Sequence, residues 1–145
     1  GIFSLLKIFD QLVEDIKLSI VGRDEEKKIN NKRINYIGHG YNASELINIY
    51  DDHNISVLPS FTEAHPKVVD ESLARFRPVI IFEDIKHIVQ NKKGIFVSKR
   101  NASSLSETIN FIMKNYSNIQ EEMNMNKLPT KQKFIDQFSD ILNSN

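Results

Sequence analysis

The fold of this chain is decided by the stretch Ile55-Ser56-Val57-Leu58-Pro59-Ser60-Phe61-Thr62-Glu63-Ala64-His65-Pro66-Lys67-Val68-Val69-Asp70-Glu71-Ser72-Leu73-Ala74. An apolar run comes first, a polar segment follows, and a run compatible with a helix leads to the apolar residues Pro78-Val79-Ile80-Ile81. This order predicts a strand, a loop, a helix and a second strand. Such units favour a parallel sheet that is covered by helices on both faces.

Two glutamates, Glu63 and Glu71, fall in the loop and in the helix of this unit. Pro66 suits the first helical turn, because its missing N–H would have no partner there. The amides of residues 67–69 then lie at the positive end of the helix dipole, where they can bind an anion, and Lys67 adds charge. A carboxylate accepts hydrogen bonds from vicinal hydroxyls, such as those of a ribose. The pattern predicts a site for a ligand that carries phosphate and hydroxyl groups.

Apolar segments with strand and helix character alternate along the rest of the chain, and this alternation predicts one α/β domain. The expected helices are Ile2–Asp15, a helix capped by Asn42 and Glu45 that ends at Tyr50, Lys67–Arg75, Ile85–Val89, and Ser104–Tyr116 with Glu107 at capping-box spacing. The expected strands are Leu18–Val21, Ile34–Ile37, Ile55–Leu58, Val79–Phe82 and Gly94–Val97. Residues 1–116 would form the core, and residues 117–145 would add C-terminal helices with a break at Pro129-Thr130.

Composition excludes several classes of function. The 145 residues suit a single domain, and the 19 basic and 19 acidic residues give a net charge of zero, which argues against nucleic acid as a partner. The chain has no cysteine and no apolar run long enough to span a bilayer. The four histidines, His39, His53, His65 and His87, show no spacing typical of metal ligands, so we expect no metal site.

The motif residues Val57-Leu58-Pro59-Ser60, Glu63, Glu71-Ser72-Leu73-Ala74 and Pro78-Val79-Ile80 are similar, in this order, to a known pattern. They resemble the C-terminal, nucleotide-sugar-binding domain of GT-B glycosyltransferases, in particular the retaining family 4. The resemblance extends over Gly1–Tyr116. It implies a Rossmann-like parallel sheet with helices on both faces, and a nucleotide diphosphate sugar, a UDP- or GDP-sugar, as donor substrate, with no other cofactor.

The resemblance also implies roles for the matching residues. Glu63 would lie near the transferred sugar as the catalytic residue, and Glu71 would bind the ribose hydroxyls. The amides of Lys67 and Val68 would face the diphosphate. His65 does not match the family pattern, but it is a candidate proton donor or hydroxyl partner next to the sugar; the alternative is a turn histidine exposed to water.

The resemblance also implies a role for two glycines, and an arginine beside one of them is a further candidate from its position alone. Gly22 and Gly38, which follow the first two expected strands, would let the backbone approach the nucleotide, although Gly is common in any turn after a strand. Arg23 follows Gly22 directly and could reach the nucleotide; the alternative is that the charged segment Arg23–Lys28 is solvated.

The sequence departs from the family pattern at four places. Ala64-His65 stands where the family more usually has Gly and an aromatic residue. Phe76 and Arg77 stand where the family has Gly and a small residue, and Phe82–Ile85 stands where a Gly-rich donor loop is common. In the family, a strand with an Arg and a Lys precedes the residue that corresponds to Gly1, and that strand is central in the sheet. We therefore expect this chain to be a fragment, with a gap between its first two strands and the rest.

The resemblance predicts a retaining hexosyltransferase of polysaccharide biosynthesis, with this chain as its donor-binding part. A glycan or lipid acceptor would bind through a missing N-terminal domain, in the bacterial cytoplasm, with at most peripheral contact with the inner face of the membrane. One alternative is a non-catalytic module that binds nucleotide sugars or a partner. Another is a receiver-like domain that uses Asp51 or Asp52, but these residues precede an expected strand instead of following one.

Overall fold

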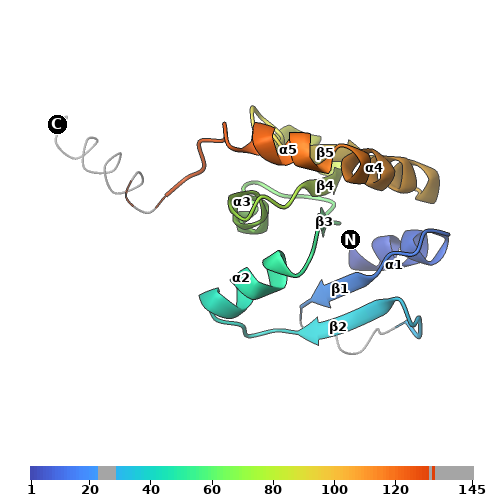
Figure 1. Ribbon diagram of the computed structural model, residues 1–145. Helices are drawn as coiled ribbons and strands as arrows, with labels where there is room; N and C mark the ends of the chain where they lie inside the picture. The colour runs from blue at the N-terminus through green and yellow to red at the C-terminus, as the bar shows by residue number, and fades with distance from the viewer. Residues whose placement is uncertain (23–28, 131, 133–145) are drawn as a thin grey trace.

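The computed structural model describes residues 1–22, 29–130 and 132 (Figure 1). The charged segment 23–28, which includes Arg23, and residues 131 and 133–145 of the expected C-terminal helices lie outside the described residues. The helices are α1 Ile2–Asp10, α2 Ala43–Asp51, α3 Lys67–Ala74, the 3₁₀ helix η2 Glu83–Ile88, α4 Ala102–Lys114 and α5 Tyr116–Met123. The strands are β1 Leu18–Val21, β2 Ile34–Gly38, β3 Ser56–Leu58, β4 Val79–Phe82 and β5 Ile95–Ser98.

All strand pairs in the described part of the chain are parallel, but they form two separate sheets. One sheet has the order β3-β4-β5, and the other contains β1 and β2. Within the described residues, no strand pairs with the remaining edge of β1 or of β3, so the expected gap between the first two strands and the rest is present. Figure 1 shows β1 and β2 apart from the other three strands, with the amino terminus between the two groups.

The core lies around β4, whose four residues Val79–Phe82 are at most 1% exposed. A central parallel strand is covered on both faces, so it reads as a continuous apolar run instead of an alternating one. Helix α3 packs on β3 and β4, and α4 packs on β5. The α1 segment supplies part of the same core through Leu5, Ile8, Phe9 and Leu12.

The predicted strands are correct to within one residue at each end, but two predicted helices are wrong at their ends. Helix α1 ends at Asp10 and not at Asp15, because the amides of Gln11 and Leu12 bond back to Ile8 and Phe9 and close the helix with tighter turns. Helix α4 begins at Ala102 and not at Ser104, because the side chain of Asn101 accepts the Ser104 amide at 2.9 Å.

Two other local predictions have different outcomes. The capping box of α2 is confirmed, since Asn42 accepts the Glu45 amide at 3.1 Å and Glu45 accepts the Asn42 amide at 2.8 Å. The predicted helix Ile85–Val89 is instead a 3₁₀ helix that starts at Glu83. The backbone of Ile85 is not helical (φ −118°, ψ 23°), so the element is kinked there, and the side chains of Ile85 and Ile88 are both buried.

The described helices are too short and too polar for any of them to cross a lipid bilayer.

Candidate functional site

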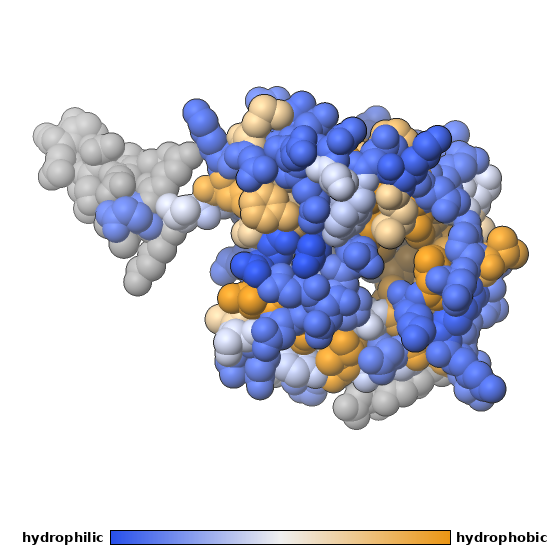
Figure 2. Space-filling model, viewed as in Figure 1, coloured by the Kyte–Doolittle hydropathy of each residue, from blue (hydrophilic) through white to orange (hydrophobic). Residues whose placement is uncertain are grey.

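A cavity of about 640 Å³ lies between the β1–β2 sheet and the edge of the β3–β4–β5 sheet. Its inner part is lined by strand residues that include Leu18, Ile20, Val57 and Val79. Figure 2 shows a hollow on the face in view, with hydrophobic residues exposed inside a largely hydrophilic rim. The outer part, which we call the mouth, is lined at the carboxyl ends of the strands and on neighbouring helices by Gly22, Gly38, Tyr50, Val68 and Glu71.

The mouth has two glycines on one side. The amide of Gly22 donates a hydrogen bond of 2.7 Å to the carbonyl of Gly38, so the ends of β1 and β2 are joined there. Gly38 has a φ of +98°, which L side chains rarely adopt, so this position favours glycine. Gly22 has open space where a Cβ would lie. The two predicted glycines therefore lie together, and only Gly38 requires glycine for its backbone.

Glu71 lies on the opposite side of the mouth, on α3. The hydroxyl of Tyr50, on the last turn of α2, lies 3.1 Å from Oε2 of Glu71 and 3.4 Å from the carbonyl oxygen of Val68. Burial, and then the charge and hydrogen bond of Glu71, raise the pKa of the Tyr50 phenol above its usual range. Sequence reasoning did not find Tyr50; the one available signal was its place at the end of the helix before the motif strand.

The start of α3 offers donors beside Glu71. Pro66 is the N-cap, and its carbonyl accepts the Val69 amide at 3.1 Å. Of the three amides expected to be free, those of Lys67 and Val68 remain without a hydrogen bond in the part of the chain that the structure describes. Val68 lines the cavity, whereas the exposed Lys67 does not. These two amides lie at the positive end of the α3 dipole.

Glu63 lies outside the residues that line the cavity. Its Oε1 accepts a hydrogen bond of 2.7 Å from the Ser60 hydroxyl, and its backbone carbonyl lies 2.8 Å from Nε2 of His87 on η2. The residue is half-buried. The structure therefore fixes Glu63 within its loop and does not bring it together with Glu71 in one cavity.

His65 also lies outside the cavity lining. Its Nε2 lies 3.2 Å from Oδ2 of Asp70 in the first turn of α3, and its side chain is 60% exposed. Lys92 binds the other oxygen of Asp70 at 2.7 Å. In this structure the side chain of His65 therefore pairs with α3 and is largely exposed to solvent.

Arg100, two residues after β5, fixes the start of the loop that carries Glu63. Its guanidinium donates to the carbonyls of Pro59 and Ser60, at 3.0 Å each, and binds Asp84 at 2.6 Å. The guanidinium carbon lies 4.0 Å from the ring centre of Phe61. Cation–π contacts and charged hydrogen bonds reinforce each other at such a site. Sequence reasoning missed Arg100, because no local pattern links it to a loop 40 residues upstream.

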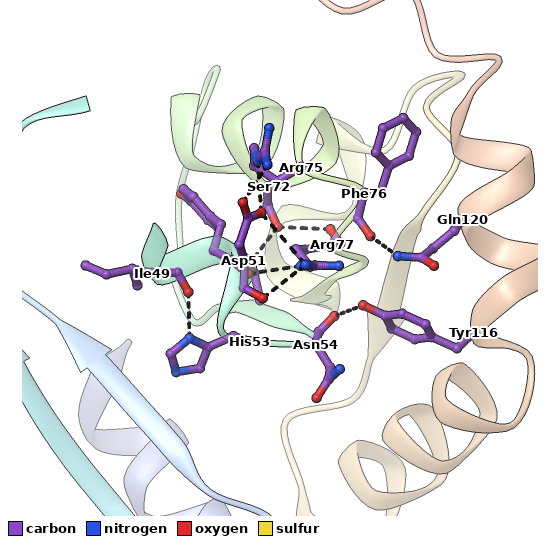
Figure 3. Close-up of polar contacts among 12 residues, drawn as sticks. Ile49, Asp51, His53, Asn54, Ser72, Arg75, Phe76, Arg77, Tyr116 and Gln120 are labelled. Atoms are coloured by element: carbon purple, nitrogen blue, oxygen red, sulfur yellow. Dashed lines mark hydrogen bonds and ion pairs between the residues drawn. The ribbon is translucent and has the colours of Figure 1, made fainter. Parts of the chain in front are cut away.

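Asp51 takes part in a structural ion-pair network (Figure 3). Its carboxylate binds Arg75 at 2.5 Å and Arg77 at 3.7 Å. The hydrogen bond from Arg75 holds the pKa of Asp51 below its ordinary value. Arg77 also donates to the carbonyls of Tyr50 and Asp51, at 3.0 Å each, which satisfies the carboxyl end of α2. Asp51 thus ends a helix instead of following a strand, and no group of potential metal ligands occurs among the described residues.

Comparisons with known proteins show the family and the fold of this chain. Residues 1–128 match the family model described as glycosyl transferases group 1. A solved structure, sucrose-phosphate synthase from Thermosynechococcus elongatus, superposes on this chain with a TM-score of 0.77 at 18% sequence identity. The match covers 99% of this chain and 42% of that one, so the chain spans less than half the length of that protein. A search of curated protein sequences gave no match.

Proposed function

From the premise that this chain belongs to the glycosyl transferases group 1 family, we propose that it is the donor-binding part of a retaining hexosyltransferase. The donor is a nucleotide diphosphate sugar, a UDP- or GDP-sugar. The single observation that carries this proposal is the mouth of the cavity, where Glu71 and the open amide of Val68 face the Gly22–Gly38 pair. Ligands of open α/β sheets bind at this edge, outside the carboxyl ends of the strands.

Each part of the mouth has a chemical counterpart in such a donor. The carboxylate of Glu71 accepts hydrogen bonds from the two ribose hydroxyls. The amides of Lys67 and Val68, with the ammonium of Lys67, bind the diphosphate at the helix N-terminus. The glycine pair leaves room for the nucleoside next to the backbone.

In this proposal, Glu63 contacts the sugar of the donor. Its loop follows β3, and Ser60 and His87 fix the carboxylate and the backbone of Glu63. A carboxylate held in this way can accept hydrogen bonds from sugar hydroxyls and orient the anomeric carbon. The diphosphate leaves with its charge stabilised by the α3 amides, since donors that are already oriented need no reorganisation during the reaction. The new bond forms on the face from which the diphosphate departs.

In this proposal, a further strand that is not in this chain fills the inner part of the cavity. The facing edges of β1 and β3 have no ladder partner among the described residues, and apolar strand residues line the space between them. Gly1 lies directly against the residue after β3, since a Cβ on Gly1 would lie 1.8 Å from the Pro59 carbonyl oxygen. A strand that ended there would run parallel to β1 and β3. An acceptor-binding domain would precede that strand and bind a glycan or lipid, at the inner face of a bacterial membrane.

The test is calorimetric titration of UDP, GDP and ADP into the protein and into Glu71→Ala. We expect one nucleotide to bind selectively and the variant to lose about 1.5–3 kcal/mol of binding free energy, because a charged hydrogen-bond acceptor is removed. Glu122→Ala, which removes an exposed carboxylate on α5, is the matched control and should bind like the unsubstituted protein. Equal affinities of the Glu71 and Glu122 variants would contradict the proposal.

A second candidate function is nucleotide-sugar binding without transfer. It is favoured by η2, which stands where the family has a Gly-rich donor loop and is fixed by Asp84 to Arg100 and by His87 to Glu63. The two candidates differ in turnover. A longer protein that includes the segment ahead of Gly1 should release nucleotide from a sugar donor if it is a transferase, and should only bind the donor if it is not.

A further inference from the structure

Tyr50, on α2, contacts Glu71, on α3, at the mouth of the cavity. Its phenol hydroxyl has a single proton to donate, and the nearer of its two acceptors is Oε2 of Glu71 at 3.1 Å. Tyr50 is half-buried, whereas Glu71 is exposed, so the tyrosine is the fixed member of the pair.

The backbone that carries Tyr50 is itself held in place. Arg77 donates to the Tyr50 carbonyl at 3.0 Å and to the Asp51 carbonyl at 3.0 Å. Arg77 also belongs to the turn that follows α3, because its carbonyl accepts a hydrogen bond of 2.9 Å from the hydroxyl of the buried Ser72. Figure 3 shows Asp51, Ser72 and Arg77 gathered between α2 and α3. The same turn therefore fixes the helix that carries Tyr50 and the helix that carries Glu71.

We propose that Tyr50 is a positioning residue that holds the Glu71 carboxylate in the orientation needed to accept the ribose hydroxyls of a nucleotide. This inference rests on the function proposed above and adds a residue that no motif of the sequence indicates. A flexible glutamate loses rotamer freedom when it binds a ligand, and a partner that orders it beforehand lowers that cost. The hydrogen bond occupies one oxygen of the carboxylate and leaves lone pairs on both for the two hydroxyls.

The first readout needs no nucleotide. In the unbound protein, the side-chain carboxyl ¹³C resonance of Glu71 should move in Tyr50→Phe, because the hydrogen bond is lost. It should stay in place in Tyr116→Phe, the matched control, whose hydroxyl donates to the Asn54 carbonyl at 2.7 Å and lies outside the cavity lining. A Glu71 resonance that is unchanged in Tyr50→Phe would overturn the proposal.

The second readout is discrimination between ribose and deoxyribose. The unsubstituted protein should bind the preferred ribonucleoside diphosphate about tenfold more tightly than its 2′-deoxy analogue. Tyr50→Phe should lower the affinity for the ribonucleotide by about three- to tenfold and the affinity for the deoxy analogue by less. The ratio of the two affinities should therefore fall. Tyr116→Phe should leave the ratio unchanged.

The outcomes separate the two proposals. A ratio in Tyr50→Phe equal to that of the unsubstituted protein would overturn the role of Tyr50 alone. No binding of any nucleotide by the unsubstituted protein would overturn the proposed function, and the ribose role of Tyr50 with it. If Tyr50→Phe folds poorly by circular dichroism, Glu71→Gln provides the second variant, and it should remove the same discrimination without changing Tyr50.

Discussion

The β3–β4–β5 region and the β1–β2 region of this chain are built from similar apolar sequences but are packed very differently. Every residue of β4 is buried, whereas β1 has three partly buried residues and one exposed residue, and α2 has none that is buried. The difference follows from coverage. Strand β4 lies between β3 and β5 and packs against α3, whereas one edge of β1, like one edge of β3, faces the cavity. Apolar sequence alone therefore does not give a buried strand; neighbours on both sides are needed.

The largest expected effect on stability comes from truncating one isoleucine in each region. Ile80→Ala in β4, at 0% exposure, should lower the free energy of unfolding by about 2–5 kcal/mol, because it removes contacts and leaves a cavity. The matched change Ile20→Ala in β1 should cost less than about 1 kcal/mol, since the Ile20 side chain already lies beside a cavity. Urea unfolding measures both, and equal losses would show that the two regions are packed alike.

Arg100 joins α1 to the β3–β4–β5 region, because it also donates to the Ser4 hydroxyl at 2.8 Å. Arg100→Ala should lower the free energy of unfolding by about 2–3 kcal/mol, since it leaves two backbone carbonyls without a donor and removes the contact with Phe61. Arg75→Ala, whose side chain is 40% exposed, is the control and should cost less. A loss for Arg100→Ala no larger than that of the control would contradict its role as a link.

Substitution of Phe76 tests whether the backbone of the β3–β4–β5 region is strained. Its φ of +54° is unfavourable for a residue with a Cβ, and the family has Gly at this position. Phe76→Gly should therefore be more stable than Phe76→Ala by about 1 kcal/mol, the reverse of the order expected in a helix. The same comparison at Gln90, with a φ of +47°, should give the same sign. The unfolding temperatures of the Gly and Ala variants measure this difference. A higher unfolding temperature for the Ala variant at both positions would show that neither backbone is strained.

The smallest expected effect is the dependence of stability on pH. Hydrogen bonds from Arg100 and Arg75 hold the pKa values of Asp84 and Asp51 below the ordinary value. The folded protein thus binds fewer protons than the unfolded chain near these pKa values, so the stabilisation is present at neutral pH and is lost as the pH falls below about 4. In Asp84→Asn and Asp51→Asn, the urea midpoint of unfolding should decrease less between pH 7 and pH 3 than it does in the unsubstituted protein. A decrease as large as that of the unsubstituted protein would show that these pairs do not contribute.

The sequence predicted the parts of this molecule that depend on local pattern. The β3–α3–β4 unit, the capping box of α2 and the gap beside β1 were all anticipated, because periodicity, turn residues and the family motif report on neighbours in the chain. Gly22 and Gly38 were each predicted to follow a strand, but only the structure shows that the amide of Gly22 binds the carbonyl of Gly38.

The remaining features depend on contacts between distant segments. Tyr50 meets Glu71 across 21 residues, and Arg100 meets Ser60 across 40. No short pattern contains both partners of either contact. The same reason applies to His65, because only the structure shows that its side chain pairs with Asp70. A prediction from spacing alone could place these side chains on elements but could not give their partners.

The most direct test of the central claim is a ¹⁵N NMR titration with the nucleotide that calorimetry selects. The claim is that both regions contribute to one nucleotide site at the mouth of the cavity. We expect the amide resonances of Gly22 and Gly38 from one region, and of Lys67 and Val68 from the other, to shift together at the same nucleotide concentration. The resonances of α4 should stay in place. Shifts confined to one of the two regions, or centred on α4, would contradict the account.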